Sequence, residues 1–348
     1  MARSSMTKLS SVAPVAAAVF GVFVATAVIG YFNYHAVFRA MAPVGWAGSI
    51  LVLATQFVLF APLGLAWYLV APDEPASRLG VFAWGRLMRE AASDVLPFSQ
   101  LGGFVIATRA VVLGGVAGSV ALGSGVVDLT VEIVSQMIYT LAGVGLLILR
   151  LDGASSHDRL LYSVLGGLVV VALMVAGFVY AQRRGLAPLE RLALRIAPSA
   201  AAHSADFNRV VEASYGRRAR LWAALATHLG CWVASAVGTW LILWLIDRPL
   251  PLTSVIAIES LLFAIKNAAF IAPAGLGVQE GAYALLGPLF GLPAEAALAL
   301  SLLKRGRDIA IGVPALLIWQ FLEGRRTRSR LGLARGPDLP EAPDLPEA

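Results

Sequence analysis

Ten ionisable side chains lie inside or at the edges of long apolar stretches of this sequence. Facing lipid at the bilayer centre, each would cost about 3 kcal/mol, or about 30 kcal/mol in total, against a net folding stability of about 5 to 15 kcal/mol. We therefore expect them to pair with one another or to face water inside the protein. The five bases are Arg109, Lys266, Lys304, Arg305 and Arg307, and the five acids are Asp128, Glu132, Glu259, Glu280 and Asp308. This balance predicts a polar, nearly neutral interior, which suits a zwitterionic or weakly polar amphiphile better than a single ion.

Two apolar stretches are too interrupted by glycine and proline to form ordinary membrane spans. Residues 91–122 contain Leu-Pro-Phe-Ser-Gln-Leu-Gly-Gly, and residues 252–292 contain Ala-Pro-Ala-Gly-Leu-Gly. Such breaks survive at membrane depth only when they are buried in protein or line a wet cavity. Half a bilayer is about 15 Å, or about ten helical residues, so each stretch predicts a re-entrant hairpin of two short limbs. The first would enter from the inner side of the membrane and the second from the outer side, as an inverted repeat requires.

The spacing of charged residues supports this repeat. In each copy 31 residues separate a proline from a charged residue, and an acid follows four positions later on the same helix face. The positions are Pro97, Asp128 and Glu132 in the first copy and Pro273, Lys304 and Asp308 in the second. If the copies face each other across the midplane, the acids of the first should meet the bases of the second, Arg305 and Arg307.

The composition predicts a polytopic membrane protein. Hydrophobic residues make up 58% of the 348 positions and charged residues 14%, and the mean hydropathy is +0.77. The net charge of +6 does not indicate a nucleic-acid partner, because the bases collect in loops beside apolar runs. The single cysteine, Cys231, excludes an internal disulfide. We expect an all-α protein with six spans, at residues 12–31, 46–70, 123–149, 160–181, 221–246 and 294–321.

The distribution of Lys and Arg predicts the orientation. Eighteen of these residues fall in segments assigned to the inner side, among them Arg78, Arg86 and Arg89, and four fall in outer loops. The positive-inside rule then places both termini in the cytoplasm. A cleaved signal peptide is the alternative for the N-terminus, where Ala-Thr-Ala resembles a cleavage site, although the apolar run continues past it.

Four regions follow from this topology. Residues 1–182 form the first membrane half, and residues 183–220 form a linker of amphipathic helices on the inner surface. Residues 221–323 form the second half. Residues 324–348 form a tail that is expected to be disordered, because Pro-Asp-Leu-Pro-Glu-Ala occurs there twice.

Motifs of common enzymes and cofactor sites do not occur in this sequence. It has no Gly-x-x-x-x-Gly-Lys-Ser/Thr phosphate loop, His-Glu-x-x-His or Gly-x-Ser-x-Gly motif, and no dinucleotide fingerprint. No extramembrane segment exceeds about 40 residues, which is short for a separate catalytic domain. We expect no cofactor, no metal and no enzymatic activity.

The candidate substrate-binding residues are the buried charges and the glycine-containing turn. A structural role, pairing helices together, is the competing interpretation, and we favour it for Lys266 and Glu259. His228, on an apolar span, is expected to be a packed histidine rather than a ligand or proton relay. Gly275 and Gly277 are expected to permit close backbone approach or a positive φ. The candidates are Arg109, Asp128, Glu132, Asn267, Pro273, Gly275, Gly277, Gln279, Glu280, Lys304, Arg305 and Asp308.

At these motifs the sequence resembles the transmembrane family named after lysylphosphatidylglycerol synthase, also called flippase-like. It is most similar to the branch encoded with hopanoid biosynthesis and called HpnL. The matching text is LPFSQLGG at 96–103, VVDLTVE at 126–132, NAAFIAPAGLGVQEG at 267–281, FGLP at 290–293 and ALALSLLKRGRD at 297–308. The likeness extends over residues 12–323. Many members carry an acid where this chain has Phe104, so an acidic symmetry of the two hairpins is not expected.

The resemblance implies lipid handling. The aminoacyl transfer of the family's name belongs to a soluble domain that this sequence lacks, so that reaction is not expected. We expect a translocase or transfer component for hopanoid or related lipids, with membrane lipids as partners and other lipid-transport or hopanoid-pathway proteins as further ones. Two alternatives remain: an accessory subunit or enzyme of lipid modification, and an ion-coupled small-molecule carrier.

Overall fold

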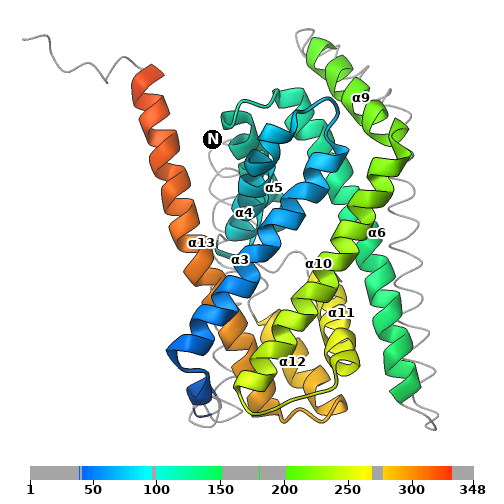
Figure 1. The fold of residues 1–348 in the computed structure, drawn as a ribbon, viewed down its shortest axis with the longest axis vertical. Coiled ribbons are helices and arrows are strands. Elements are labelled where there is room, and N and C mark those ends of the chain that lie inside the picture. Colours follow the sequence, from blue (N-terminus) through cyan, green and yellow to red (C-terminus); the bar gives the residue numbers. More distant parts are fainter. Residues whose placement is uncertain are drawn as a thin grey trace, which may run out of the picture.

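The described part of the chain folds into helices joined by short connections (Figure 1). The structure is a computed structural model that describes residues 39, 41–95, 99–150, 180, 201–268 and 277–330. The helices are η1 Ala42–Val44, α3 Gly45–Val70, η2 Ala76–Arg78, α4 Leu79–Val95, α5 Ser99–Leu113, α6 Gly118–Arg150, α9 Ala201–Gly216, α10 Arg218–Leu245, α11 Leu252–Ala268, α12 Val278–Leu289 and α13 Ala294–Arg330. The expectation of an all-helical fold is confirmed for these residues.

Three described segments are long and apolar enough to cross a membrane: Ala42–Val70, Gly118–Leu149 and Arg218–Leu245. They correspond to the expected spans 46–70, 123–149 and 221–246. The expected span 294–321 lies within α13, which carries several charges as well as apolar residues. The expected spans 12–31 and 160–181 lie outside the described residues.

Large apolar side chains remain exposed on the outside of the helices. Trp46 is 88% exposed, Trp222 69% and Phe321 64%. Water would disfavour such a surface, whereas hydrocarbon would not, so a helix that is apolar on its outer side as well as its inner side fits a membrane. The exposed side of this fold is therefore the lipid-facing side.

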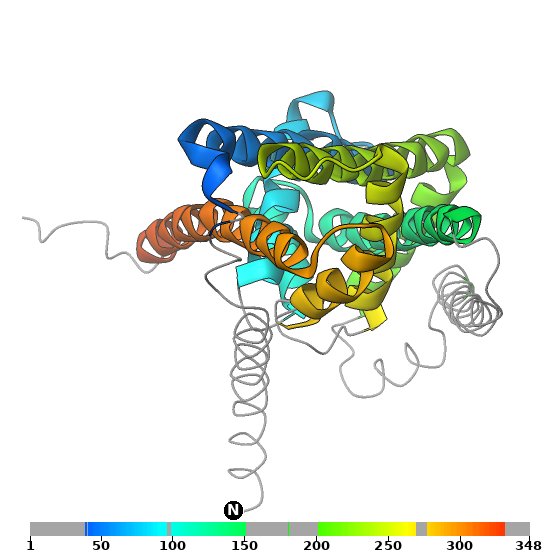
Figure 2. The same cartoon turned by 90° about the horizontal axis from the view of Figure 1, so that it is seen from below.

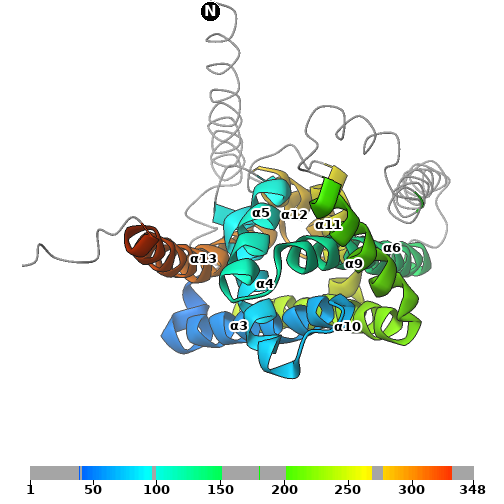
Figure 3. The same cartoon turned by 90° about the horizontal axis from the view of Figure 1, so that it is seen from above.

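The order of helix lengths repeats along the chain. Helices α3, α4, α5 and α6 have 26, 17, 15 and 33 residues, and helices α10, α11, α12 and α13 have 28, 17, 12 and 37. Each half is thus a long helix, two short helices and a second long helix. Helices α3 and α10 run side by side in one layer, as Figures 2 and 3 show. Helix α6 of the first half packs on α11 of the second, and α13 of the second packs on α4 of the first.

The turns that precede the last helix of each half have the same backbone geometry. Gly115, after α5, has φ +91°, and Gly291, after α12, has φ +81°. Each of these glycine N–H groups donates to a carbonyl three residues back, and the next N–H donates to a carbonyl five residues back. A glycine in a left-handed conformation is the common way to end a helix, because it lacks a Cβ. The two glycines are 176 positions apart, as are Asp128 and Lys304.

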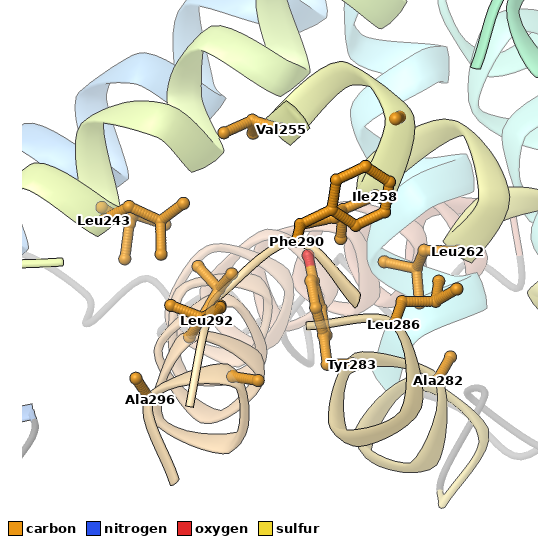
Figure 4. Packing of buried hydrophobic residues seen from close by; sticks show 14 of the residues in the cluster. Leu243, Val255, Ile258, Leu262, Ala282, Tyr283, Leu286, Phe290, Leu292 and Ala296 are labelled. Atoms are coloured by element: carbon orange, nitrogen blue, oxygen red, sulfur yellow. The ribbon is translucent and has the colours of Figure 1, made fainter. Parts of the chain in front are cut away.

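Buried apolar side chains form several clusters, and the three largest each contain residues from the earlier and the later helices of the chain. In the second half, Tyr283 and Leu286 of α12 pack against Ile258 and Leu262 of α11, and Phe290 closes the cluster from the following turn (Figure 4). In the first half, Trp67 of α3 packs against Phe82 of α4 with ring centroids 5.6 Å apart. These cores hold the short helices against the long ones.

One expectation about the first half is wrong. The sequence placed Arg86 and Arg89 in an inner loop, but α4 begins at Leu79, and their exposed fractions are 1% and 5%. The segment contains enough apolar residues to form a buried helix, and its two arginines find acidic partners there. The interrupted motifs expected at the hairpins are residues 96–103 and 272–277; of these, residues 96–98 and 272–276 lie outside the described residues.

Helix α9 lies within the expected linker of residues 183–220 and packs along α6; residues 183–200 of that linker lie outside the described residues. Helix α13 continues to Arg330, seven residues beyond the boundary placed at residue 323.

Candidate functional site

A first ion network joins α4, α6 and α10 in the protein interior. Its buried members are Arg86 and Arg89 from α4, Asp128 and Glu132 from α6, and His228 from α10, and the half-buried Glu90 of α4 also accepts from Arg86 at 3.1 Å. The five buried residues have exposed fractions of at most 9%. Spacings of three and four residues put each pair of like charges on one face of its helix. The long side chains of Arg86 and Arg89 then reach from α4 to the acids of α6, and α3 and α5 pack against both helices.

Arg86 is the centre of this first network. Its Nη1 and Nη2 donate to the two carboxylate oxygens of Glu132 at 3.0 and 2.9 Å, and Nη1 also lies 3.4 Å from Asp128 Oδ2. Arg89 Nη1 donates to Glu132 Oε2 at 2.7 Å. The second carboxylate, Asp128, has His228 Nε2 at 3.0 Å from its Oδ1. Bidentate guanidinium–carboxylate geometry is the strongest form of this interaction, so the network fixes α4 to α6.

These contacts correct the expected pairing. The acids Asp128 and Glu132 meet bases of their own half rather than Arg305 and Arg307 of the other half. The cause is that the arginines of α4 reach the acids of α6, whereas Arg305 pairs with Glu280 and Arg307 with Asp308. The sequence could have indicated these two arginines, because Arg86, Arg89 and Glu90 have the spacing of one helix face in a stretch bounded by apolar residues. His228 is packed, as expected, but it also contacts an acid.

A second ion network lies in the other half, around Lys304 of α13. Lys304 Nζ donates to Glu259 Oε2 of α11 at 2.6 Å, to Tyr283 Oη of α12 at 2.8 Å and to Thr239 Oγ1 of α10 at 3.2 Å. The Tyr283 hydroxyl donates to Glu259. Lys304 is 4% exposed and Glu259 0%. All three ammonium protons therefore have partners in a site without lipid or solvent contact.

The two networks use the same numbered positions in their helices, with the charges exchanged. The eighth residue of the first short helix is Arg86 in α4 and Glu259 in α11. The eleventh residue of the last long helix is Asp128 in α6 and Lys304 in α13. In each half one side chain from the short helix therefore pairs with one from the long helix, and the base and the acid change places between halves. Sequence spacing identified Asp128 and Lys304 but not their partners.

Helix α10 and its aromatic neighbours connect the two networks. Trp232 Nε1 donates to Ser135 Oγ at 3.0 Å, and Ser135 Oγ donates to the carbonyl of Glu132 at 2.7 Å. The Trp232 ring packs edge to face on Phe263, with centroids 4.6 Å apart, and Lys304 Nζ lies 6.0 Å from the Phe263 centroid. A movement of α10 would therefore change contacts in both networks.

A third group of contacts surrounds the start of α12. The carboxylate of Glu280 accepts from the backbone N–H of Gly277 at 2.9 Å and from Arg305 Nε at 2.8 Å. Gln279, 4% exposed, donates to Ser301 Oγ at 3.1 Å and accepts from Lys266 Nζ at 3.3 Å. A carboxylate that binds the first free N–H groups of a helix stabilises its N-terminus. These residues place the start of α12 against α13.

Replacing Gly277 by alanine should destabilise the protein by about 1 to 2 kcal/mol, because its φ of +78° is a left-handed conformation that a Cβ disfavours. The control is Gly281→Ala, four residues later in α12, where an added Cβ meets nothing within 4 Å and alanine favours the helix. The thermal unfolding midpoint of each purified variant checks this. Equal midpoints would show that the backbone at Gly277 relaxes without cost.

The remaining candidates lie apart from the two networks. Arg109 pairs with Glu323 at 2.7 Å on the exposed side of α5 and α13, where their side chains are 44% and 27% exposed. Asp308 pairs with its neighbour Arg307 at 2.8 Å. Asn267 lies in the last turn of α11, while Pro273 and Gly275 lie outside the described residues.

A small polar pocket lies where α4 of the first half meets α13 of the second. It has a volume of about 10 Å³, room for about one water molecule. Three carboxylates and one amide line it together with apolar side chains. The lining residues are Gln56, Phe60, Glu90, Ala91, Asp94, Asp308, Ile311 and Gly312. A headgroup could enter only if α4 and α13 separated. Among the described residues, no group of His, Cys, Asp and Glu side chains has the geometry to hold a metal ion.

The fold and these networks define a multi-pass helical membrane protein with a charged interior. The sequence model of one known family, the lysylphosphatidylglycerol synthase TM region, matches residues 11–315. The chain therefore belongs to this flippase-like family of membrane proteins, which implies association with membrane lipids. No curated protein and no solved structure matches the chain.

Proposed function

We propose that this protein is a translocase or transfer component for lipids of the bacterial inner membrane, acting on hopanoid or related lipids, in the hopanoid-associated HpnL branch of its family. The observation that carries the proposal is the pair of charge-exchanged networks at equivalent places in two similar halves. Paired halves around a polar centre are the usual architecture of proteins that open alternately to the two sides of a membrane.

The proposal treats the two halves as an inverted repeat with re-entrant hairpins. Three independent features support this: the repeated order of helix lengths, the matched glycine turns 176 positions apart, and the equivalent ion pairs. The contacts between halves are also reciprocal, since α6 packs on α11 as α13 packs on α4. Reciprocal contacts of this kind are what a two-fold relation between halves produces.

The polar pocket at α4 and α13 is the proposed point of headgroup entry. It lies between the halves and is lined by Glu90, Asp94 and Asp308, which offer hydrogen-bond acceptors to hydroxyl or amine groups. Apolar side chains on the outside of α3 and α13, such as Phe57 and Leu317, would keep the tail in hydrocarbon. The headgroup would then cross along the polar interior while the lipid body stays in the bilayer.

The proposed orientation places α9 and the end of α13 in the cytoplasm. With Arg86 and Arg89 removed from the loop count, the inner side keeps 16 of its 18 basic residues, against four outside. Positive charge beside spans favours the cytoplasmic side. Both chain termini would then be cytoplasmic, and residues 246–251 would face outward.

Purified protein in liposomes should speed the transfer of a labelled lipid between leaflets above the rate in protein-free liposomes. A membrane-impermeant quencher removes the signal of labelled lipid in the outer leaflet, so the rate of further signal loss measures transfer from the inner leaflet. Comparing labelled phospholipids and hopanoids in this assay identifies the substrate. If no lipid of the panel moves faster than in protein-free liposomes, the proposal is wrong.

The three carboxylates of the pocket also favour a second candidate, an ion-coupled small-molecule carrier. Carboxylates close together cannot all ionise easily, so such a pocket can take up and release a proton. The same liposomes separate the two, because a carrier would respond to an imposed pH gradient and would move no lipid.

A further inference from the structure

The turn after α3 carries an aspartate in an unusual backbone conformation. Asp73 has φ +59°, and Asp247, in the turn after α10, has φ +54°; they are the two non-glycine residues of positive φ in the described part of the chain. Aspartate tolerates this conformation better than most residues. Since α3 and α10 begin the two similar halves, the turns are equivalent, and each leads into a short helix.

Within the described ranges, the first of these turns is joined by an ion pair to the start of α10, and the second is not. The Asp73 carboxylate accepts from Arg217 Nη2, at the junction of α9 and α10. Beside this pair, Ser214 Oγ of α9 donates to the carbonyl of Val70 at 2.7 Å. At the other end of the turn, Arg78 Nη1 donates to the carbonyl of Gly114 at 3.1 Å. The segment between α3 and α4 therefore connects the start of α10 with the turn before α6.

The second turn lacks an equivalent connection among the described residues. Asp247 is exposed and forms no ion pair there. The connection after α10 is held instead by Trp240 Nε1, which donates to the carbonyl of Leu250 within the same half, at 3.0 Å. The two faces of the protein thus differ in one respect: an ion pair joins the halves at the face that contains α9.

We propose that Asp73 and Arg217 form an ionic latch that holds the α9 face closed and breaks when the two halves separate there. The latch is suited to reversible opening, because Asp73 and Arg217 have side chains 85% and 34% exposed, and exposed ion pairs are weak. The proposed function enters only as the reason for the opening, which would be lipid transfer. The opening itself is a property of the protein without lipid.

The reaction rate of a buried thiol measures how often the latched face opens. Val211 of α9 is 0% exposed and packs in the cluster that contains Val70 and Val116, so a Val211→Cys thiol is protected until this face separates. Val255, 0% exposed at the start of α11, reports on the opposite face in the same way. Each reporter is placed singly in a Cys231→Ala background and reacted with a water-soluble maleimide in detergent.

Arg217→Gln and Asp73→Asn should each raise the rate at Val211→Cys about twofold to fivefold and leave the rate at Val255→Cys unchanged. Asparagine keeps the turn, since it also tolerates positive φ. Arg217→Lys, which retains the charge, should react at the wild-type rate. The matched control is Arg209→Gln, which removes an exposed pair with Asp206 that stays within α9 and should change neither rate.

Unchanged rates in both Arg217→Gln and Asp73→Asn would overturn the latch, as would equal increases at both reporters, which would indicate general loosening. Should Val211→Cys itself fail to fold, Val116→Cys, 3% exposed in the same cluster, replaces it. The assay contains no lipid substrate, so a failed lipid-transfer assay beside a working latch would reject the proposed function and keep the latch.

Discussion

Replacing Arg86 by glutamine should destabilise the protein by about 3 to 5 kcal/mol, because it leaves buried carboxylates without their main partner. Glu132 would lose two hydrogen bonds, of 3.0 and 2.9 Å, and Asp128 would lose a contact at 3.4 Å. Arg89 would remain as a partner of Glu132. Thermal unfolding of the purified protein in detergent measures the loss.

The control for Arg86 is Arg109→Gln, which breaks an exposed pair with Glu323 and should cost at most about 1 kcal/mol. Adding Glu132→Gln to Arg86→Gln should restore part of the stability, since one stranded charge is removed. The double variant Glu132→Gln with Arg305→Gln should gain no stability over the sum of its single variants, because Arg305 pairs with Glu280 rather than with Glu132. Recovery in that second combination would show that the networks of the two halves are coupled directly.

Replacing Lys304 by methionine should lower the free energy of unfolding by a similar amount, about 3 to 5 kcal/mol, because the buried carboxylate of Glu259 loses its charged partner. Lys304 loses contacts to Glu259, Tyr283 and Thr239, all buried. The double variant Lys304→Met with Glu259→Gln should recover most of the stability, since no buried charge remains unpaired. Unfolding midpoints of the single and double variants measure this recovery.

The same double variant separates a role in transport from a purely structural one. If the second network supplies polar partners during lipid passage, the double variant should fold but transfer lipid at no more than about a tenth of the wild-type rate. A tenfold slower rate corresponds to an activation free energy that is higher by about 1.4 kcal/mol. Wild-type transfer by the double variant would assign Lys304 and Glu259 to structure alone.

Local patterns in the sequence were enough for the class of protein and for three of its spans. Hydropathy predicted three described spans, since a run of about 20 apolar residues depends only on neighbours along the chain. The cost of charge in hydrocarbon predicted that buried charges would pair, whatever their partners. The equal spacing of Asp128 and Lys304 from their prolines predicted equivalent positions in the two long helices, and both residues are eleventh in their helix.

The choice of partners depended on the tertiary structure. Asp128 and Glu132 pair with Arg86 and Arg89 because α3 and α5, which pack against both α4 and α6, hold these helices within reach of each other's long side chains. The paired residues are more than 40 positions apart in the chain. Tyr283 joins Lys304 and Glu259 only because α11, α12 and α13 converge there. Charge, hydropathy and spacing are properties of the chain, whereas which oppositely charged side chains meet depends on how the helices are packed in space.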